Sequence, residues 1–294
     1  YDKYIFYADM GGVLRCVDTD TLQPVWAVAT GDAVMAAVAM DLTENRELNL
    51  YTANMLANRK KGSDHIQIRR YDALSGKEAW CTDIGVTKGK KEKADVGAKA
   101  SPVIGQNKLK DFVYFTVTGL SEEGRVQLNL GGEEKSALIA LNKDSGRIAW
   151  SMGMESRTES SPVAVYDGDG NGWIIQCAED GNIYLVDGLT GKEGGSLKLE
   201  AEIIASPAVY NDTMVIGTTG KGTSFIYGIE IRTTKSGETP AETEAEEPPE
   251  AEEAKPEMHA EEEPAEEEAA PGDWEEEWAD EEGEGELADR KSVV

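Results

Sequence analysis

The sequence predicts an all-β fold: a β-propeller of four-stranded antiparallel blades, followed by a disordered acidic C-terminal tail. Three observations support this. Short runs of β-branched and aromatic residues alternate with turn residues as far as residue 232, which is the strand signal. A turn pattern recurs along the same region. After about residue 233 the composition changes to Glu, Ala and Pro with little else.

The repeated turn is clearest at residues 71–80, which read YDALSGKEAW. Related segments begin at residues 17, 141 and 186, and their Asp or Asn positions lie 54, 70 and 45 residues apart along the chain. A period near 45 residues with four short strands in each unit is typical of propeller blades. A stacked β-solenoid is the competing repeat architecture, but it usually has a shorter period.

The expected strands follow from this period. In the first unit they cover residues 4–9, 13–17 and 24–30, and in the second 33–39, 48–54, 66–71 and 78–84. In the third they cover 101–104, 112–118, 136–141 and 147–152, and in the fourth 160–165, 172–177, 182–186 and 193–199. The fifth holds 205–209, 214–218 and 224–231. Three units are thus complete, the first lacks an inner strand and the fifth an outer one. We therefore expect four to five blades that are part of a larger propeller.

The repeated turn residues have clear physical roles. An Asp or Asn at a strand end can hydrogen-bond to its own turn backbone, and a Gly supplies the positive φ of a tight turn. The tryptophans then have room to pack between adjacent blades. We expect structural roles for Trp26, Asp72, Gly76, Trp80, Gly146, Trp150, Asp187 and Gly191. The first copy departs from the pattern at Leu22 and Gln23, and the fourth at Gly194 and Gly195, which predicts looser blade contacts there.

The pattern Asp-x-x-[Ser/Thr]-Gly-Lys-x-x-Trp resembles the repeat of the pyrroloquinoline-quinone (PQQ)-like β-propellers. Ser-Pro-Val at 101–103 and 161–163, Ser-Pro-Ala at 206–208 and the strand at 181–187 are similar to other motifs of this group. The resemblance covers residues 1–232. The group includes quinoprotein dehydrogenases and non-enzymatic BamB-like scaffold proteins, so the resemblance is specific for fold and not for function.

The resemblance implies a bacterial extracytoplasmic protein, whether secreted, periplasmic or at the cell surface. Its leading implication is a non-catalytic binding or scaffold propeller that presents loops to a protein or carbohydrate partner, with no catalytic residue and no cofactor. The alternative is a PQQ-dependent oxidoreductase whose cofactor residues lie in blades missing from this chain. By resemblance, that class needs a catalytic Asp, a bound calcium ion and a quinone stacked on Trp. Many members also carry two adjacent cysteines, which this chain lacks.

The loop at residues 167–172, DGDGNG, is the best candidate for a metal site. Asp167, Asp169 and Asn171 alternate with glycines in the way that calcium loops wrap an ion. The closing carboxylate is missing, because Ile175 stands at the ninth position and Ala178 at the twelfth. A plain hairpin turn is therefore the favoured interpretation, and calcium is the only cofactor left open. Residues 41–49 occupy the equivalent place and read as a degenerate copy.

The remaining reactive residue types predict no catalytic site. The cysteines Cys16, Cys81 and Cys177 are far apart in apolar runs, which favours buried free thiols over a zinc or redox pair. The two histidines, His65 and His259, have no Ser, Cys or Asp partner nearby in the sequence that would suggest a triad or a zinc catalyst.

The net charge of −28 resides mostly in the tail, because 25 acidic and 4 basic residues follow residue 234. We expect residues 233–288 to be disordered and the chain not to bind nucleic acid. The tail is a candidate to contact the basic loops at 59–61 and 88–93, or a basic partner. Trp274 and Trp278 read as a docking motif or as incidental aromatics. Residues 289–294 resemble a translated sequencing adapter.

The sequence also bears on membrane attachment and targeting. No apolar run reaches the ~20 residues needed to span a membrane. No signal peptide is visible in the chain as given, which opens with Tyr1 directly before a strand pattern.

Overall fold

The computed structural model describes residues 1–57, 64–87, 96–220 and 224–232. All of them belong to one compact unit, Tyr1–Glu238. The predicted tail at 233–288, the adapter-like residues 289–294, His259, and the basic loops at 59–61 and 88–93 lie outside the described residues. None of the described helices is long and apolar enough to cross a membrane.

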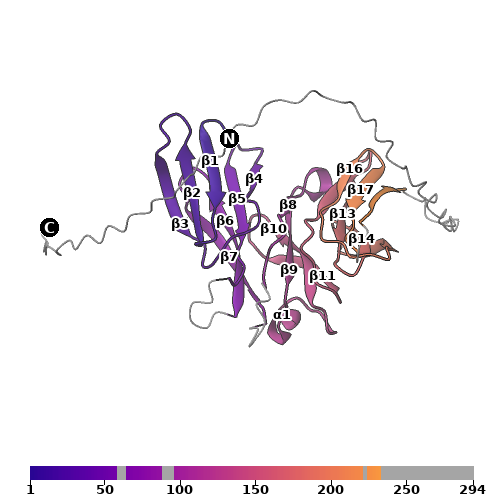
Figure 1. The fold of residues 1–294 in the computed structure, drawn as a ribbon. Helices are drawn as coiled ribbons and strands as arrows, with labels where there is room; N and C mark the ends of the chain where they lie inside the picture. The colour runs from indigo at the N-terminus through magenta and orange to yellow at the C-terminus, as the bar shows by residue number, and fades with distance from the viewer. Residues whose placement is uncertain (58–63, 88–95, 221–223, 233–294) are drawn as a thin grey trace, which may run out of the picture. The chain divides into compact units, whose positions relative to one another are not determined.

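The described strands form five antiparallel sheets that follow one another along the chain (Figure 1). Blade 1 contains β1 (Tyr4–Ala8), β2 (Val13–Asp18) and β3 (Pro24–Ala29). Blade 2 contains β4 (Ala39–Leu42), β5 (Leu48–Ala53), β6 (His65–Asp72) and β7 (Glu78–Gly85). Blade 3 contains β8 (Val103–Ile104), β9 (Phe112–Thr118), β10 (Ser136–Asn142) and β11 (Ile148–Met154). Blade 4 contains β12 (Val163–Tyr166), β13 (Gly172–Cys177), β14 (Asn182–Asp187) and β15 (Glu193–Lys198), and blade 5 contains β16 (Ala208–Tyr210), β17 (Thr213–Gly217) and β18 (Ile226–Glu230).

This arrangement confirms the predicted fold class and the predicted number of strands in each unit. Blades 2, 3 and 4 have four strands, whereas blades 1 and 5 have three each. Each blade is a simple meander in which neighbouring strands pair in sequence order. Short connections between sequential strands make such a sheet from local contacts alone.

The predicted strand at 33–39 is wrong, because the inner strand of blade 2 is β4, which begins only at Ala39. The backbone of the predicted segment bonds to neighbouring units instead of a sheet partner. The Val34 amide donates to the carbonyl of Asp9, and the Ala33 carbonyl accepts from Met55. This run of small apolar residues is therefore a partly buried connection rather than a strand, and the polar turn after it is shorter than predicted.

The Ser-Pro motifs lie just before the inner strands and link the blades in series. The amide of Ala37 donates to Ser101 Oγ over 3.1 Å, the amide of Ser101 to Ser161 Oγ over 2.9 Å, and the amide of Ser161 to Ser206 Oγ over 2.9 Å. Each serine therefore uses its hydroxyl toward one neighbour and its amide toward the next. The following proline has no amide to leave unpaired.

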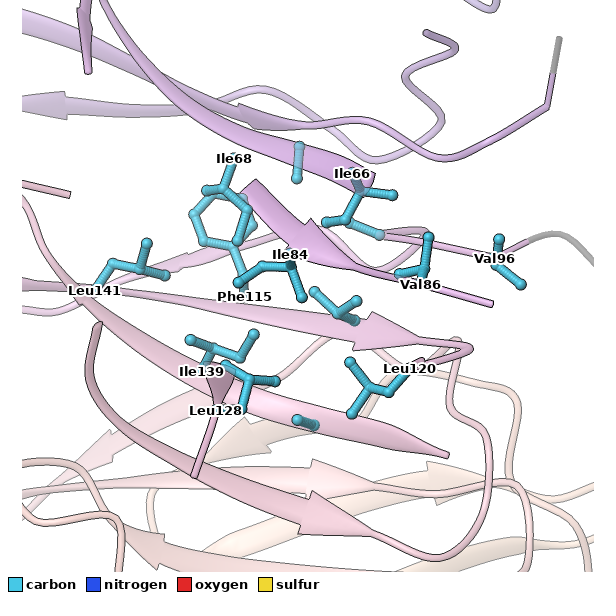
Figure 2. Close-up of a cluster of buried hydrophobic side chains, with 14 of the residues drawn as sticks. Ile66, Ile68, Ile84, Val86, Val96, Phe115, Leu120, Leu128, Ile139 and Leu141 are labelled. Atoms are coloured by element: carbon cyan, nitrogen blue, oxygen red, sulfur yellow. The ribbon is translucent and has the colours of Figure 1, made fainter. Parts of the chain in front are cut away.

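The apolar core lies between blades. The largest cluster joins blades 2 and 3, with Ile66, Ile68 and Ile84 facing Phe115 and Ile139 (Figure 2). These five side chains are fully buried. Separate clusters join blades 1 and 2, blades 3 and 4, and blades 4 and 5. Burial of apolar area at about 25 cal/mol per Å² makes these contacts the main stabilising term of the fold.

Two short helices that the sequence analysis did not predict interrupt the blades. The 3₁₀-helix η1 covers Asn107–Leu109 between β8 and β9, and α1 covers Glu122–Gln127 between β9 and β10. The hydroxyl of Ser121 caps α1 by accepting a hydrogen bond from the Gly124 amide over 3.1 Å. Ser at an N-cap followed by two acidic residues is a strong start signal for a helix.

Candidate functional site

The acidic or amide residue of the repeated turn holds its own turn closed. Asp72 Oδ1 accepts from the Ser75 amide over 2.8 Å, and Asn142 Oδ1 accepts from the Ser145 amide over 3.0 Å. In blade 4, Asp187 Oδ1 accepts from two turn amides and one hydroxyl. Each of these oxygens thus has a backbone partner within its own blade.

The tryptophan of each repeated turn packs against the glycine of the following blade. A Cβ added to Gly76 would lie 2.7 Å from the Trp26 ring, one added to Gly146 2.6 Å from Trp80, and one added to Gly191 2.6 Å from Trp150. The three glycines have φ values of 69°, 68° and 72°. Glycine is therefore needed twice, for the backbone conformation and for the space that the ring occupies.

Each of these tryptophans also donates its indole N–H to the backbone of the following blade. Trp26 Nε1 donates to the Ala73 carbonyl over 3.0 Å, Trp80 Nε1 to that of Lys143 over 2.7 Å, and Trp150 Nε1 to that of Gly188 over 3.0 Å. Both the ring and the N–H group of these tryptophans thus take part in the contact between blades.

At the two places where the sequence departs from the repeat, the contact between tryptophan and glycine is missing. Leu22 takes the glycine position in blade 1 with φ of 56°, and 74% of its side chain is exposed. No described tryptophan packs against it. In blade 4, Gly195 stands at the tryptophan position, and all six residues of β15 are exposed.

The Asp167 loop is a hairpin turn closed by its own side chains. Asp167 Oδ1 accepts from the amides of Asp169 and Asn171, and Asp167 Oδ2 accepts from Asn171 Nδ2 over 2.7 Å. Lys108 Nζ donates to Asn171 Oδ1 over 2.7 Å. The hydrogen bond from Asn171 lowers the pKa of Asp167. Among the described residues, no three His, Cys, Asp or Glu side chains gather to hold a metal ion.

The cysteines and the described histidine lie apart from one another. Cys16 and Cys177 are buried free thiols, and burial raises the pKa of Cys177 to about 12. Cys81 is only half-buried, in contrast to the expected full burial. His65 contacts Asp64 over 2.9 Å and Glu123 over 3.4 Å, so the expectation that it has no Asp partner nearby in the sequence was wrong. Burial lowers the pKa of His65, but these two carboxylates raise it by more.

A polar pocket of about 370 Å³ opens between blades 2 and 3. It lies where the β4–β5 hairpin of blade 2 meets the β8–β9 connection and the β10–β11 turn of blade 3. Its lining residues are Asp41, Leu42, Thr43, Glu44, Asn45, Glu47, Asn49, Tyr51, Gly105, Gln106, Lys110, Asp111, Lys143 and Asp144. The pocket is the candidate functional site.

A buried ion pair crosses the pocket. Lys143 Nζ of blade 3 lies 3.0 Å from Asp41 Oδ2 of blade 2, with side chains 10% and 16% exposed. The same ammonium donates to the Gly105 carbonyl over 3.2 Å. A pair this deeply buried gains little net stability over apolar residues, because both charges lose their hydration. Its clear effect is to fix the two blades in register at this point.

Asn49, a lining residue of the pocket, carries a buried donor without a partner. Arg70 Nε donates to Asn49 Oδ1 over 3.0 Å. A guanidinium carries only donors, so the atom facing it must be the amide oxygen, and Nδ2 is turned away from Arg70. The residue is 3% exposed, and Nδ2 has no hydrogen-bond partner among the described residues.

Tyr51 presents a second unpaired group, and the next blade shows why. At the equivalent position of blade 3, the Tyr114 hydroxyl donates to the Gly188 carbonyl over 2.9 Å. The corresponding carbonyl for Tyr51 is that of Lys143, which already accepts from Trp80 and, over 3.0 Å, from Arg70. The Tyr51 hydroxyl, in a fully buried residue, finds no partner in the described part of the chain. Burial raises its pKa, so the hydroxyl stays protonated.

Sequence reasoning named residues 41–49 only as a degenerate copy of the calcium loop, and it did not identify a pocket shared with blade 3. A signal was nevertheless present, because the pocket is built from departures from the repeat. By strand register, Asn49 holds the position in blade 2 that Phe112 holds in blade 3. Lys143 directly follows the turn Asn of blade 3, and Gly188 holds the same position in blade 4. In the contact between blades 3 and 4, the equivalent space is filled by Leu109, Phe112 and Tyr166.

Comparison with known proteins agrees with this architecture. The family model described as outer membrane protein assembly factor BamB matches residues 134–239, about a third of the chain. A beta-alanine-activating enzyme of Danio rerio is 24% identical over 107 residues, which are 35% of this chain and 9% of that protein.

Two solved structures share the fold. BamB from Moraxella catarrhalis is 14% identical, with a TM-score of 0.50 over 79% of this chain and 56% of that one. A quinohemoprotein alcohol dehydrogenase from Pseudomonas putida is 16% identical, with a TM-score of 0.51 over 74% of this chain and 42% of that one. The chain thus spans about half the length of these structures. Its repeats, its blades and these matches identify it as a β-propeller repeat protein of the PQQ-like, BamB-like type.

Proposed function

We propose that the chain is a non-catalytic binding propeller of bacterial extracytoplasmic location, which presents loops to a protein or carbohydrate partner. The pocket between blades 2 and 3 supports this proposal most directly. The pocket is a concave surface where two blades meet, and it is lined by charged and polar side chains that can orient a partner. Concave sites with a few converging polar groups are the usual place for a ligand.

The tryptophan contacts also favour binding over quinone chemistry. A quinone cofactor would need the face of a tryptophan ring to stack on. The rings of Trp26, Trp80 and Trp150 pack against glycines of the next blade, and their N–H groups are bonded there. These three side chains therefore hold adjacent blades together.

The experiment compares quinone-dependent activity with pocket behaviour in the same purified chain. The chain is incubated with PQQ and calcium, and dye reduction is followed with alcohols and aldoses as donors. We expect no rate above a protein-free blank. Saturable, PQQ-dependent dye reduction would overturn the proposal and favour the oxidoreductase alternative.

A pair of variants tests whether the pocket is preformed. Tyr51→Phe removes a hydroxyl with no partner, so the free energy of unfolding without ligand should change by less than about 0.5 kcal/mol or rise. Tyr114→Phe removes a hydroxyl bonded to Gly188 in the next blade and should cost about 1–2 kcal/mol. Equal losses in the two variants would show that Tyr51 is an ordinary structural residue.

A further inference from the structure

Blades 1 and 5, the first and last of the series, each expose a sheet face of a kind that the inner blades bury (Figure 1). Among the described residues, eighteen large apolar side chains are exposed; six of them lie in residues 1–30 and five in residues 201–232. Terminal repeats of stacked architectures normally carry a polar outer face. We infer that these two apolar faces bind each other between copies of this chain, so that the protein self-associates head to tail.

The face of blade 1 that points away from blade 2 is apolar. On β1, Phe6 packs toward blade 2, and Ile5 and Tyr7 alternate with it, so their side chains leave the sheet on the opposite side. Ile5 holds the position that Leu50 holds in blade 2, because each pairs with the residue just before the turn Asp of its own blade. Leu50 is fully buried in the cluster that joins blades 1 and 2, whereas Ile5 is 53% exposed.

The face of blade 5 that points away from blade 4 is also apolar. On β17, Met214 packs toward blade 4, and Val215 points to the opposite side. By strand register, Val215 and Ile226 hold the positions that Ile175 and Ile183 hold in blade 4. Ile175 and Ile183 are buried in the cluster that joins blades 4 and 5, whereas Ile226 is 81% exposed.

The two exposed faces are the two halves of the contact that joins blades throughout the chain. In each such contact, the face that one blade turns toward its successor packs on the face that the next blade turns toward its predecessor. Blade 5 exposes the first kind of face and blade 1 the second. Blade 1 of a second copy can therefore follow blade 5 as blade 5 follows blade 4, and apolar area on both sides leaves water.

The tryptophan contact indicates which blade can precede blade 1. Leu22 has the glycine position, because its amide donates to the Asp18 carbonyl as the Gly76 amide donates to that of Asp72. Its side chain takes the space that a tryptophan ring fills at Gly76, so a preceding blade with the repeated tryptophan does not fit. Residues 201–232 contain no tryptophan. Blade 5 can therefore pack against blade 1 of another copy without this clash.

This association joins unlike faces, so it is heterologous. A heterologous contact closes into a ring of copies if the rotation between them allows it and otherwise continues as an open chain. The pocket between blades 2 and 3 takes no part in it. The inference therefore stands apart from the proposed binding function, and the two can fail separately.

Sedimentation velocity of the full chain over the micromolar range measures the association. We expect the average mass to rise above that of one chain as the concentration increases. Ile5→Lys places a charge on the blade 1 face and Ile226→Lys places one on the blade 5 face. A charge buried without a partner in an apolar contact is costly, so each variant should raise the dissociation constant about tenfold or more.

Controls separate the contact from loss of the fold. Val126→Lys, on α1 of blade 3, also changes an exposed apolar side chain to lysine and should associate like the parent chain. Tyr210→Lys changes a second exposed position on the blade 5 face and should act like Ile226→Lys. The melting temperature of each dilute variant shows whether its blades remain folded.

An equimolar mixture of Ile5→Lys and Ile226→Lys is the decisive measurement. The first variant keeps an intact blade 5 face and the second keeps an intact blade 1 face, so one contact can still form between them. We expect neither variant to associate alone and the mixture to give a 1:1 dimer that grows no further. Non-specific aggregation would not stop at this size.

Four outcomes would overturn the inference. The first is a parent chain that stays monomeric at the highest concentration. The second is association of Ile5→Lys alone or of Ile226→Lys alone, which would show that two like faces meet or that other surfaces do. The third is equal dissociation by Val126→Lys. The fourth is a mixture of the two face variants that remains monomeric.

Discussion

Gly146→Ala tests the contact that joins one blade to the next. In the structure a Cβ at this position would lie 2.6 Å from Cδ2 and Cε3 of Trp80, a distance that real Cβ atoms do not show. The backbone φ of 68° adds a second penalty, because an L side chain is strained in the left-handed region. Both effects destabilise the folded state.

The expected magnitude follows from these two penalties. Left-handed backbone strain costs roughly 1–2 kcal/mol, and overpacking against a ring held by its own hydrogen bond costs roughly 1–3 kcal/mol. Reduced entropy of the unfolded chain returns about 0.4–1 kcal/mol. We therefore expect Gly146→Ala to lower the free energy of unfolding by about 2–4 kcal/mol.

Urea unfolding of purified variants measures this loss, with Gly168→Ala as the matched control. Gly168 has no atom within 4 Å of an added Cβ, so its variant should stay within about 0.5 kcal/mol of the parent. In a Trp80→Ala background the clash is removed, and Gly146→Ala should then cost only the backbone strain. Equal losses for Gly146→Ala and Gly168→Ala, or no coupling to Trp80, would refute the reasoning.

Three further predictions concern other contacts. Burial lowers the pKa of His65, but the Asp64 and Glu123 carboxylates raise it above the ordinary value for histidine. The stabilisation by these ion pairs should therefore be complete below about pH 6.5 and lost as the pH rises through the raised pKa; urea unfolding should show this loss in the parent and not in His65→Gln. Millimolar calcium should leave the melting temperature unchanged, because Asp167 already accepts hydrogen bonds from its own loop; a rise that Asp167→Asn abolishes would contradict this. Ser161→Ala should cost about 1–2 kcal/mol by leaving the Ser101 amide unpaired, and a neutral result would show that the serine series adds nothing.

The blades could be predicted from the sequence because their signals are local. The aspartate, glycine and tryptophan of a repeated turn lie within nine residues, so the sequence shows each strand end directly. The segment at 33–39 was mispredicted because a run of small apolar residues does not reveal where its backbone groups form hydrogen bonds. The Ala33 carbonyl accepts from Met55 and the Ala37 amide donates to Ser101, so its partners lie outside its own sheet.

The pocket could not be predicted in the same way, because its groups meet only when two blades pack. Lys143 and Asp41 are about a hundred positions apart in the chain. The Tyr51 hydroxyl is unpaired because Arg70 and Trp80 already donate to the Lys143 carbonyl. Aligning the blades against one another shows which positions depart from the repeat. It does not show which of those departures face a common space.

The tryptophan-to-glycine contact has a consequence for how such chains change in length. Blades 2 and 3 each carry both halves of the joint, a ring for the next blade and a glycine for the preceding one, so the joint is head-to-tail. A blade can therefore be duplicated, deleted or exchanged as a cassette without redesigning its neighbours. At Leu22 of blade 1 a side chain fills the glycine position, so a tryptophan ring cannot pack there as Trp26 packs on Gly76.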